Sequence, residues 1–227
     1  MSSLQPFPEE WSRAVCVMAH PDDLEYGPAA AVARWTGLGR EVSYLFVTSG
    51  EAGIEGTPPE RAGPLREREE RAAAAHVGVE DLEFLGFPDS AIRNTPELRR
   101  AIAEAVARRD PELIVLLNHH ARWAFGGGNS DDHRNTGHAV LQCAREHDFP
   151  RLRWIAIADS PEIDHAVDVT ATIDAGLAAL REHRAYLDAL GGEKWSVDHV
   201  LGNAERAGEL FGTTYAAAFE LQEPGTA

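Results

Sequence analysis

Short, almost wholly apolar segments recur along this chain, and helical patterns separate them. Such runs are typical of strands that are covered on both faces of a sheet. The expected strands lie at residues 14–19, 41–48, 82–85, 113–117, 154–158 and 167–170. The expected helices lie at residues 27–38, 65–77, 96–109, 134–146 and 171–190. This alternation predicts an α/β fold that is Rossmann-like, a mostly parallel sheet with helices on both faces.

The length and charge of the chain restrict its organisation and its partners. Its 227 residues fit one large domain, so a single domain is expected over residues 1–227. Lys and Arg number 21 against 37 Asp and Glu, which gives a net charge of −16. An acidic surface repels phosphate backbones and anionic lipid, so no nucleic-acid and no membrane partner is expected.

Other features of the composition bear on location and redox chemistry. The N-terminal segment lacks a basic region followed by an apolar one, so no secretory signal is expected and a cytoplasmic location is predicted. The two cysteines, Cys16 and Cys143, lie in a strand pattern and a helix pattern, which indicates buried side chains rather than a disulfide or a nucleophile. Acidic single-domain enzymes of this size commonly self-associate, so a homo-oligomer stays open.

A polar motif, His20-Pro21-Asp22-Asp23, directly follows the first strand. Because a residue before proline avoids helical dihedral angles, His20 is expected at the extended carboxyl end of that strand. Open α/β sheets bind their ligands at this edge. One imidazole and two carboxylates can supply two ligands to a divalent metal and leave one carboxylate free as a base.

A third protein ligand is expected from another strand end, and His133 is the best candidate. It follows the longest irregular stretch of the chain, residues 118–132, and long loops in compact domains are usually functional. Two histidines and a carboxylate leave one position for water, as in catalytic zinc sites. Asp22 is then the natural general base. On the residues alone, the alternative is that Asp22 and Asp23 only cap the next helix and that His133 lies on the surface.

Residues 17–25 (VMAHPDDLE) resemble the opening motif of the LmbE-like, or PIG-L, family of zinc-dependent N-acetylglucosaminide deacetylases. Further similar segments follow in the family's order, at residues 45–53, 66–69, 72–75, 77–79, 85–90, 131–137, 167–170, 179–184 and 215–219. The resemblance thus covers nearly the whole chain. It implies a metal-dependent hydrolase that removes an acetyl group from an N-acetylated amino sugar or a related amide. It also implies one Zn²⁺ per chain, with Fe²⁺ as the alternative metal.

The resemblance also implies roles for individual residues. It makes His20, Asp23 and His133 the zinc ligands and Asp22 the general base. Residues that face the sugar in related deacetylases correspond to Glu51, Arg66 and Asp89. For Arg66, an alternative is an ion pair with Glu69 on a solvated helix.

The chain departs from the family where many members carry His-Pro-Asp-His. It reads Ser130-Asp131-Asp132-His133, so the histidine thought to stabilise the oxyanion or protonate the leaving amine is missing. Either His119 or His120 replaces it, or Ser130 donates a weaker hydrogen bond, or the activity is reduced or altered. Asp132 is expected to receive the spare N–H of a histidine or to orient the base.

Three other functions compete with the hydrolase. A dinucleotide-binding oxidoreductase is disfavoured because no Gly-x-Gly-x-x-Gly follows the first strand. An aspartyl-phosphate phosphatase could use Asp22 as nucleophile with magnesium, but it would have no use for His20 or His133. A non-catalytic or divergent member of the fold that binds zinc or a ligand stays open, because Ser130 replaces the usual histidine.

Overall fold

A computed structural model describes residues 4–224 of the chain. Its strands form one eight-stranded sheet in the order β1-β7-β8-β6-β5-β2-β3-β4. The strands are β1 (Gln5–Pro6), β2 (Arg13–Met18), β3 (Glu41–Phe46), β4 (Asp81–Phe84), β5 (Leu113–Leu117), β6 (Trp154–Ala158), β7 (His165–Asp168) and β8 (Ala216–Gln222). All neighbouring strands are parallel except β8, which runs antiparallel to β6 and β7. The predicted mostly parallel sheet is confirmed.

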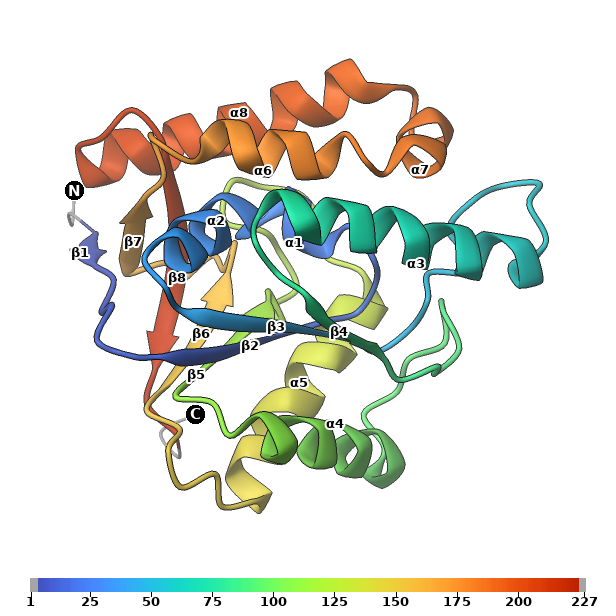
Figure 1. The fold of residues 1–227 in the computed structure, drawn as a ribbon, viewed down its shortest axis with the longest axis horizontal. Helices are drawn as coiled ribbons and strands as arrows, with labels where there is room; N and C mark the ends of the chain where they lie inside the picture. Colours follow the sequence, from blue (N-terminus) through green and yellow to red (C-terminus); the bar gives the residue numbers. More distant parts are fainter. Residues whose placement is uncertain (1–3, 225–227) are drawn as a thin grey trace.

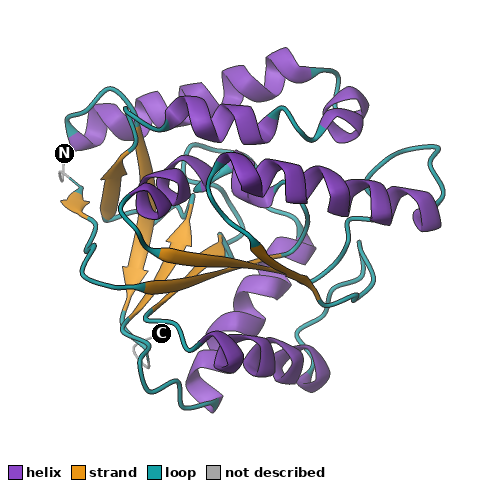
Figure 2. Ribbon diagram, viewed as in Figure 1, coloured by secondary structure: helices purple, strands orange, loops and turns teal. Residues whose placement is uncertain are grey.

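Helices cover both faces of this sheet, as expected (Figure 1, Figure 2). The helices are α1 (Asp23–Tyr26), α2 (Ala29–Gly37), α3 (Pro59–His76), α4 (Pro96–Arg109), α5 (Asp131–Glu146), α6 (Ile173–Leu180), α7 (Arg184–Ala189) and α8 (Glu193–Phe211). Figure 1 shows α4 and α5 on one face and the remaining helices on the other. None of the helices in residues 4–224 is both long and apolar enough to cross a bilayer.

The core follows from the two-sided burial of the central strands. Along β2, Cys16 and Met18 pack into the apolar cluster beneath α2, whereas Val15 and Val17 pack into the cluster beneath α4 and α5. Successive side chains of a strand point to opposite faces, so an unbroken apolar run is what two covered faces require. Both cysteines are buried and unpaired, and burial raises the pKa of each thiol, which agrees with a packing role.

The order of the strands explains where a site forms. The chain passes from β2 to β3 and β4 on one side and then returns to place β5 and β6 on the other side of β2. The boundary between β2 and β5 is therefore the point where the winding reverses, and ligands of open α/β sheets bind there. Because β2, β5 and β6 are parallel, the segments that follow them emerge at one edge of the sheet.

The C-terminal third differs most from the expected elements. The helix expected over residues 171–190 is broken into α6 and α7, because His183 turns inward between them and is fully buried beside Glu25 and Glu70. The sequence pattern also missed the long helix α8 and the strand β8. The N-terminal segment, in which no secretory signal is expected, begins with residues 1–3, and these lie outside the described residues.

Two glycines of α8 allow a matched test of its packing. A Cβ on Gly208 would lie 2.6 Å from the backbone oxygen of Thr214, whereas a Cβ on Gly202 would meet nothing within 4 Å. We expect Gly208→Ala to lower the free energy of unfolding by about 1–3 kcal/mol, because backbone atoms must shift. Gly202→Ala is expected to raise it by about 0.5–1 kcal/mol. Chemical denaturation of both variants measures these free energies of unfolding. Equal changes in the two variants would contradict the close packing at Gly208.

Candidate metal centre and active site

Three potential metal ligands converge at the boundary between β2 and β5. His20 follows β2, Asp23 begins α1, and His133 lies in the first turn of α5. Asp23 Oδ1 lies 3.1 Å from His133 Nε2 and 3.6 Å from His20 Nδ1. Ligand atoms bound tetrahedrally to zinc at about 2.0–2.1 Å lie about 3.4 Å apart, so these three atoms fit one ion. The structure therefore brings the three expected ligands together.

The contacts around these side chains turn one ligand atom of each toward the other two. Asp23 Oδ2 accepts hydrogen bonds from the backbone N–H groups of Ala19 and His20, both at 2.9 Å, which leaves Oδ1 facing the histidines. His133 Nδ1 lies 3.0 Å from Asn129 Oδ1, which suits Nδ1–H as the donor and leaves Nε2 unprotonated. Such outer contacts fix the tautomer and ring orientation of metal-binding histidines.

The other nitrogen of His20 faces two carboxylates. His20 Nε2 lies 3.2 Å from Asp89 Oδ1 and 3.4 Å from Asp132 Oδ2. Burial by itself would lower the pKa of His20, but Asp23, Asp132 and Asp89 together outweigh it and raise this pKa well above its usual value. For Asp23 the signs are reversed: burial by itself would raise the pKa of its carboxyl, but the two histidines outweigh burial and lower this pKa. This excess of acid is an environment that favours a bound cation.

The expected base, Asp22, is held by its backbone and by its side chain. Its φ is 97°, a left-handed conformation in which Asp and Asn are tolerated. Its N–H donates to Glu70 Oε2 at 3.1 Å, and its Oδ1 accepts from Arg66 Nη2 at 2.7 Å. Burial raises the pKa of the Asp22 carboxyl to about 6, although Arg66 opposes this shift. The Asp22 carboxylate is thereby fixed in the wall of the cavity that the three potential ligands also line.

A fully buried group of ionisable side chains contacts the backbone of Asp22. His183 Nε2 lies 3.2 Å from Glu25 Oε2 and 3.6 Å from Glu70 Oε2, and all three side chains are buried. Glu70 is the member that reaches the Asp22 backbone. Sequence reasoning missed Glu25 and Glu70. The signal that could have found Glu70 is its position on the apolar face of α3, where it is buried together with Ala73 and Ala74.

The three residues expected to face the sugar have different surroundings. Arg66 is 2% exposed and donates to the backbone oxygens of Pro21 and Gly50 as well as to Asp22. It makes no ion pair with Glu69, whose Oε1 accepts from the Ala185 N–H. Asp89 and Arg66 both line the cavity described below. Glu51 is not in that wall, and its Oε1 accepts from the Asp89 N–H at 2.8 Å, so it shapes the loop of Asp89.

A cavity of about 740 Å³ opens onto the metal ligands and Asp22. Its wall includes Ser130, which stands where many family members carry a histidine. Ser130 is exposed, and its Oγ caps the N-terminus of α5 by accepting the His133 N–H at 3.1 Å. The neighbouring Asp132 is buried. Its Oδ2 faces His20, and its Oδ1 accepts from the Ile92 N–H at 3.1 Å.

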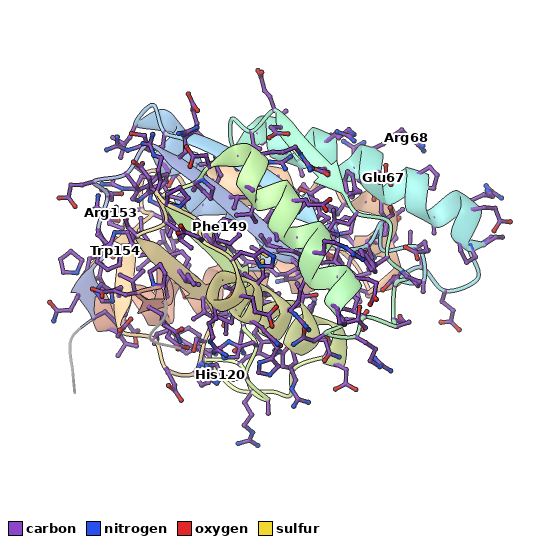
Figure 3. All side chains as sticks on the ribbon, turned by 90° about the horizontal axis from the view of Figure 1, so that it is seen from below. Glu67, Arg68, His120, Phe149, Arg153 and Trp154 are labelled. Carbon is purple, nitrogen blue, oxygen red and sulfur yellow. The ribbon has the colours of Figure 1, made fainter. Side chains whose placement is uncertain are left out.

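Neither histidine proposed as a substitute at position 130 lines this cavity. His120 lies on the loop between β5 and α5, far from Glu67 and Arg68 of α3 (Figure 3). Its Nε2 is 2.9 Å from Glu220 Oε2. The His119 ring packs on it at 4.1 Å between centroids. Of the three alternatives for the missing imidazole, the positions of His119 and His120 favour Ser130 over a rearranged histidine.

This fold and site define an α/β protein with a candidate metal centre open to a ligand cavity, and comparison with known proteins gives its family. Residues 15–144 match the family PIG-L, described as GlcNAc-PI de-N-acetylase. The chain belongs to this family. It is 26% identical to the diacetylchitobiose deacetylase of Thermococcus kodakarensis, over 93% of this chain and 83% of that protein. It is 30% identical to a probable N-acetyl-alpha-D-glucosaminyl L-malate deacetylase of Bacillus anthracis, over 65% of this chain and 67% of that protein.

Solved structures share the fold. The N,N'-diacetylchitobiose deacetylase from Pyrococcus horikoshii aligns with a TM-score of 0.84 and 22% identity, over 96% of this chain and 85% of that one. A 4-carboxy-2-hydroxymuconate hydratase from Pseudomonas putida aligns with a TM-score of 0.76 and 18% identity, over 95% and 98% of the two chains. The same architecture thus occurs in proteins named for different reactions, so function has to be argued from the site.

The contact between Asn129 and His133 gives a test of the proposed ligand geometry. We expect Asn129→Ala to weaken zinc binding by about 10–100-fold, because the imidazole loses the group that orients it. The measurement is competition against a chromogenic chelator. Asn129 also donates to the backbone oxygens of Asn118 and His120, so the melting temperature of the metal-free variant is measured alongside. A large loss of stability with unchanged zinc affinity would contradict the orienting role.

Proposed function

We propose that this chain is a metal-dependent deacetylase that hydrolyses the N-acetyl group of an amino sugar or a sugar conjugate. His20, Asp23 and His133 would hold the metal, and Asp22 would be the general base. The single observation that carries this proposal is the meeting of three potential ligand atoms in the wall of a cavity that the Asp22 carboxyl also lines. The names of the family's members, deacetylases of N-acetylglucosamine derivatives, agree with it.

The donor set favours zinc, with iron as the alternative. Two imidazoles and one carboxylate are a common protein ligand set for catalytic zinc, and they leave one position open. A zinc ion held there would polarise the amide carbonyl and make a water molecule acidic near neutral pH. Elemental analysis of protein purified without added metal is expected to find about one zinc or iron per chain.

The residues around the ion would divide the proton transfers between them. Asp22 would take the proton of the attacking water and deliver it to the amide nitrogen as the C–N bond breaks, so that acetate and a free amine are released. Arg66 would keep Asp22 in place, since its guanidinium binds the Asp22 carboxylate and the adjacent Pro21 carbonyl. The charge of Arg66 also opposes the rise in the pKa of Asp22 that burial causes.

Ser130 would be a donor to the acetyl oxygen. Its Oγ accepts the His133 N–H, so the hydroxyl hydrogen is left for the cavity side. Asp132 would orient His20 through the 3.4 Å contact. Asp89 would serve both His20 and the sugar, because one of its oxygens faces His20 and the residue lines the cavity.

The experiment that tests the proposal is an assay of the zinc-loaded protein with N-acetylglucosamine, N,N'-diacetylchitobiose and N-acetylglucosaminyl L-malate. Acetate and primary amine are measured together, and their release in equal amounts from at least one compound is the expected result. Zinc-dependent binding of a compound without any acetate release would overturn the proposal and favour the non-catalytic binding protein.

A further inference from the structure

A carboxylate that the mechanism does not use lies in the same cavity as the metal ligands. Asp159 directly follows β6 at the carboxyl edge of the sheet and lines the cavity together with His20, Asp23 and His133. Its φ is 56°, a left-handed conformation that Asp adopts more readily than most residues with a side chain.

The surroundings of Asp159 fix it in the wall of this cavity, where it also borders a smaller void lined by Gly27. Its backbone oxygen accepts from the Ala124 N–H at 3.0 Å, which ties it to the loop between β5 and α5. On the other side, a Cβ on Gly27 would lie 2.9 Å from Asp159 Oδ2. The lack of a side chain at Gly27 therefore leaves the space that the carboxylate occupies, beside the end of the helix that begins with Asp23.

This carboxylate has no partner among residues 4–224. No hydrogen bond or ion pair reaches the oxygens of this half-buried carboxylate, although carboxylates withdrawn from water are normally paired. Burial raises the pKa of the Asp159 carboxyl to about 7, because nothing nearby offsets the lost solvation. Arg206, a cation in the cavity wall, lies over the Phe125 ring at 5.8 Å and donates to Asn203 Oδ1 at 3.3 Å instead.

The aromatic lining of the cavity suits a second ring. Its wall carries Trp123 and Phe125 from the loop between β5 and α5, and Trp195 and Asn203 from α8. Trp195 is 56% exposed and stacks on His199, so it presents a flat apolar face. The cavity volume of about 740 Å³ lies in the upper half of the range of about 300–1,000 Å³ that ligand pockets span. The volume and the aromatic faces therefore leave room beyond one acetylated sugar.

We propose that Asp159 is a specificity-determining residue that accepts hydrogen bonds from the hydroxyl groups of a neutral second unit, a sugar or polyol, joined to the N-acetylated sugar. The inference rests on the proposed deacetylase function and extends it to the substrate class. In its ionised form, an unpaired carboxylate would accept from hydroxyls and would repel a carboxylate or phosphate on the second unit. The substrate is thus a neutral glycoside rather than an anionic conjugate.

Binding measurements separate this proposal from the proposed reaction. Calorimetry is done on zinc-loaded Asp22→Asn protein, which is expected to bind the sugars without hydrolysing them. Three forms are compared: one that keeps Asp159, one with Asp159→Asn and one with Asp159→Gly. Asparagine keeps the shape, and both replacements suit the left-handed backbone. We expect the affinity for N,N'-diacetylchitobiose to fall about 10-fold with Asp159→Asn and about 100-fold with Asp159→Gly.

The controls are a shorter ligand, an anionic ligand and a distant variant. Affinity for N-acetylglucosamine is expected to stay unchanged, and N-acetylglucosaminyl L-malate is expected to bind Asp159→Asn more tightly than the parent. Glu104→Gln, an exposed acid on α4, should change none of these affinities. Equal losses for the one-ring and two-ring sugars, or no loss for either, would overturn the role of Asp159. Absence of acetate release by the unmodified protein with these binding results intact would overturn the deacetylase function alone.

Discussion

Asp22→Asn is expected to lower kcat for acetate release by about 10²–10⁴-fold while the protein still binds one metal ion. Asparagine has nearly the same shape, tolerates the left-handed φ of 97° at this position and can still accept from Arg66 through its amide oxygen. What is lost is the ability to take up a proton. KM is expected to change little, because the substitution removes a group needed only in the transition state.

The measurement combines steady-state kinetics with metal analysis of the same preparation. Asp131→Asn is the control, since Asp131 lies in the first turn of α5 with a side chain that is 77% exposed and is not part of the cavity wall. It should retain full activity. Near-normal turnover by Asp22→Asn would remove this residue from the mechanism, and loss of metal together with turnover would assign it a structural role.

His133→Ala is expected to abolish stable metal binding and, with it, acetate release. His133 is the single ligand contributed by the loop and helix that follow β5, more than a hundred residues from His20 and Asp23. Its loss leaves one imidazole and one carboxylate. The affinity should therefore fall by more than the about 10–100-fold that the loss of an orienting group causes. Equilibrium dialysis against buffered zinc measures the affinity.

The matched control is His138→Ala on the same helix. His138 is exposed and contacts the His119 ring, outside the cavity. This variant is expected to bind zinc and to release acetate as the unmodified protein does. If His133→Ala kept both properties, the ligand set would be wrong; if His138→Ala lost them as well, the effect would reflect the stability of α5 rather than coordination.

The metal ligands were open to prediction because local sequence and fold topology agree. An apolar strand followed by His20-Pro21-Asp22-Asp23 places these side chains at a carboxyl strand end. The parallel sheet then brings the segment after β5 to the same edge. The capping alternative for Asp22 and Asp23 does not describe the structure, since α1 receives no side-chain cap from Asp22.

The supporting residues could not be read from the sequence in the same way. Whether Arg66 forms an ion pair on a solvated helix or reaches Asp22 depends on how α3 packs, and both patterns look alike in sequence. The role of Glu70 depends on His183, which lies 113 residues further along the chain, between α6 and α7. Asp159 resembles any loop acid until β6 is placed beside β5.

The C-terminal elements were missed for a physical reason as well. Gly202 and Gly208 lower the helix propensity of the segment that forms α8, and tertiary packing overrides that preference. Gly208 approaches the backbone of Thr213 and Thr214 so closely that only glycine fits. The strand β8 lies between β6 and β7 and pairs antiparallel with both. No local sequence pattern specifies that the chain returns to this place in the sheet.

Anomalous diffraction from crystals grown with zinc tests the metal centre most directly. Data collected on both sides of the zinc absorption edge are expected to show one strong peak bounded by His20 Nδ1, Asp23 Oδ1 and His133 Nε2. Density next to these atoms without an anomalous signal, or a peak confined to the buried group of Glu25, Glu70 and His183, would contradict the site.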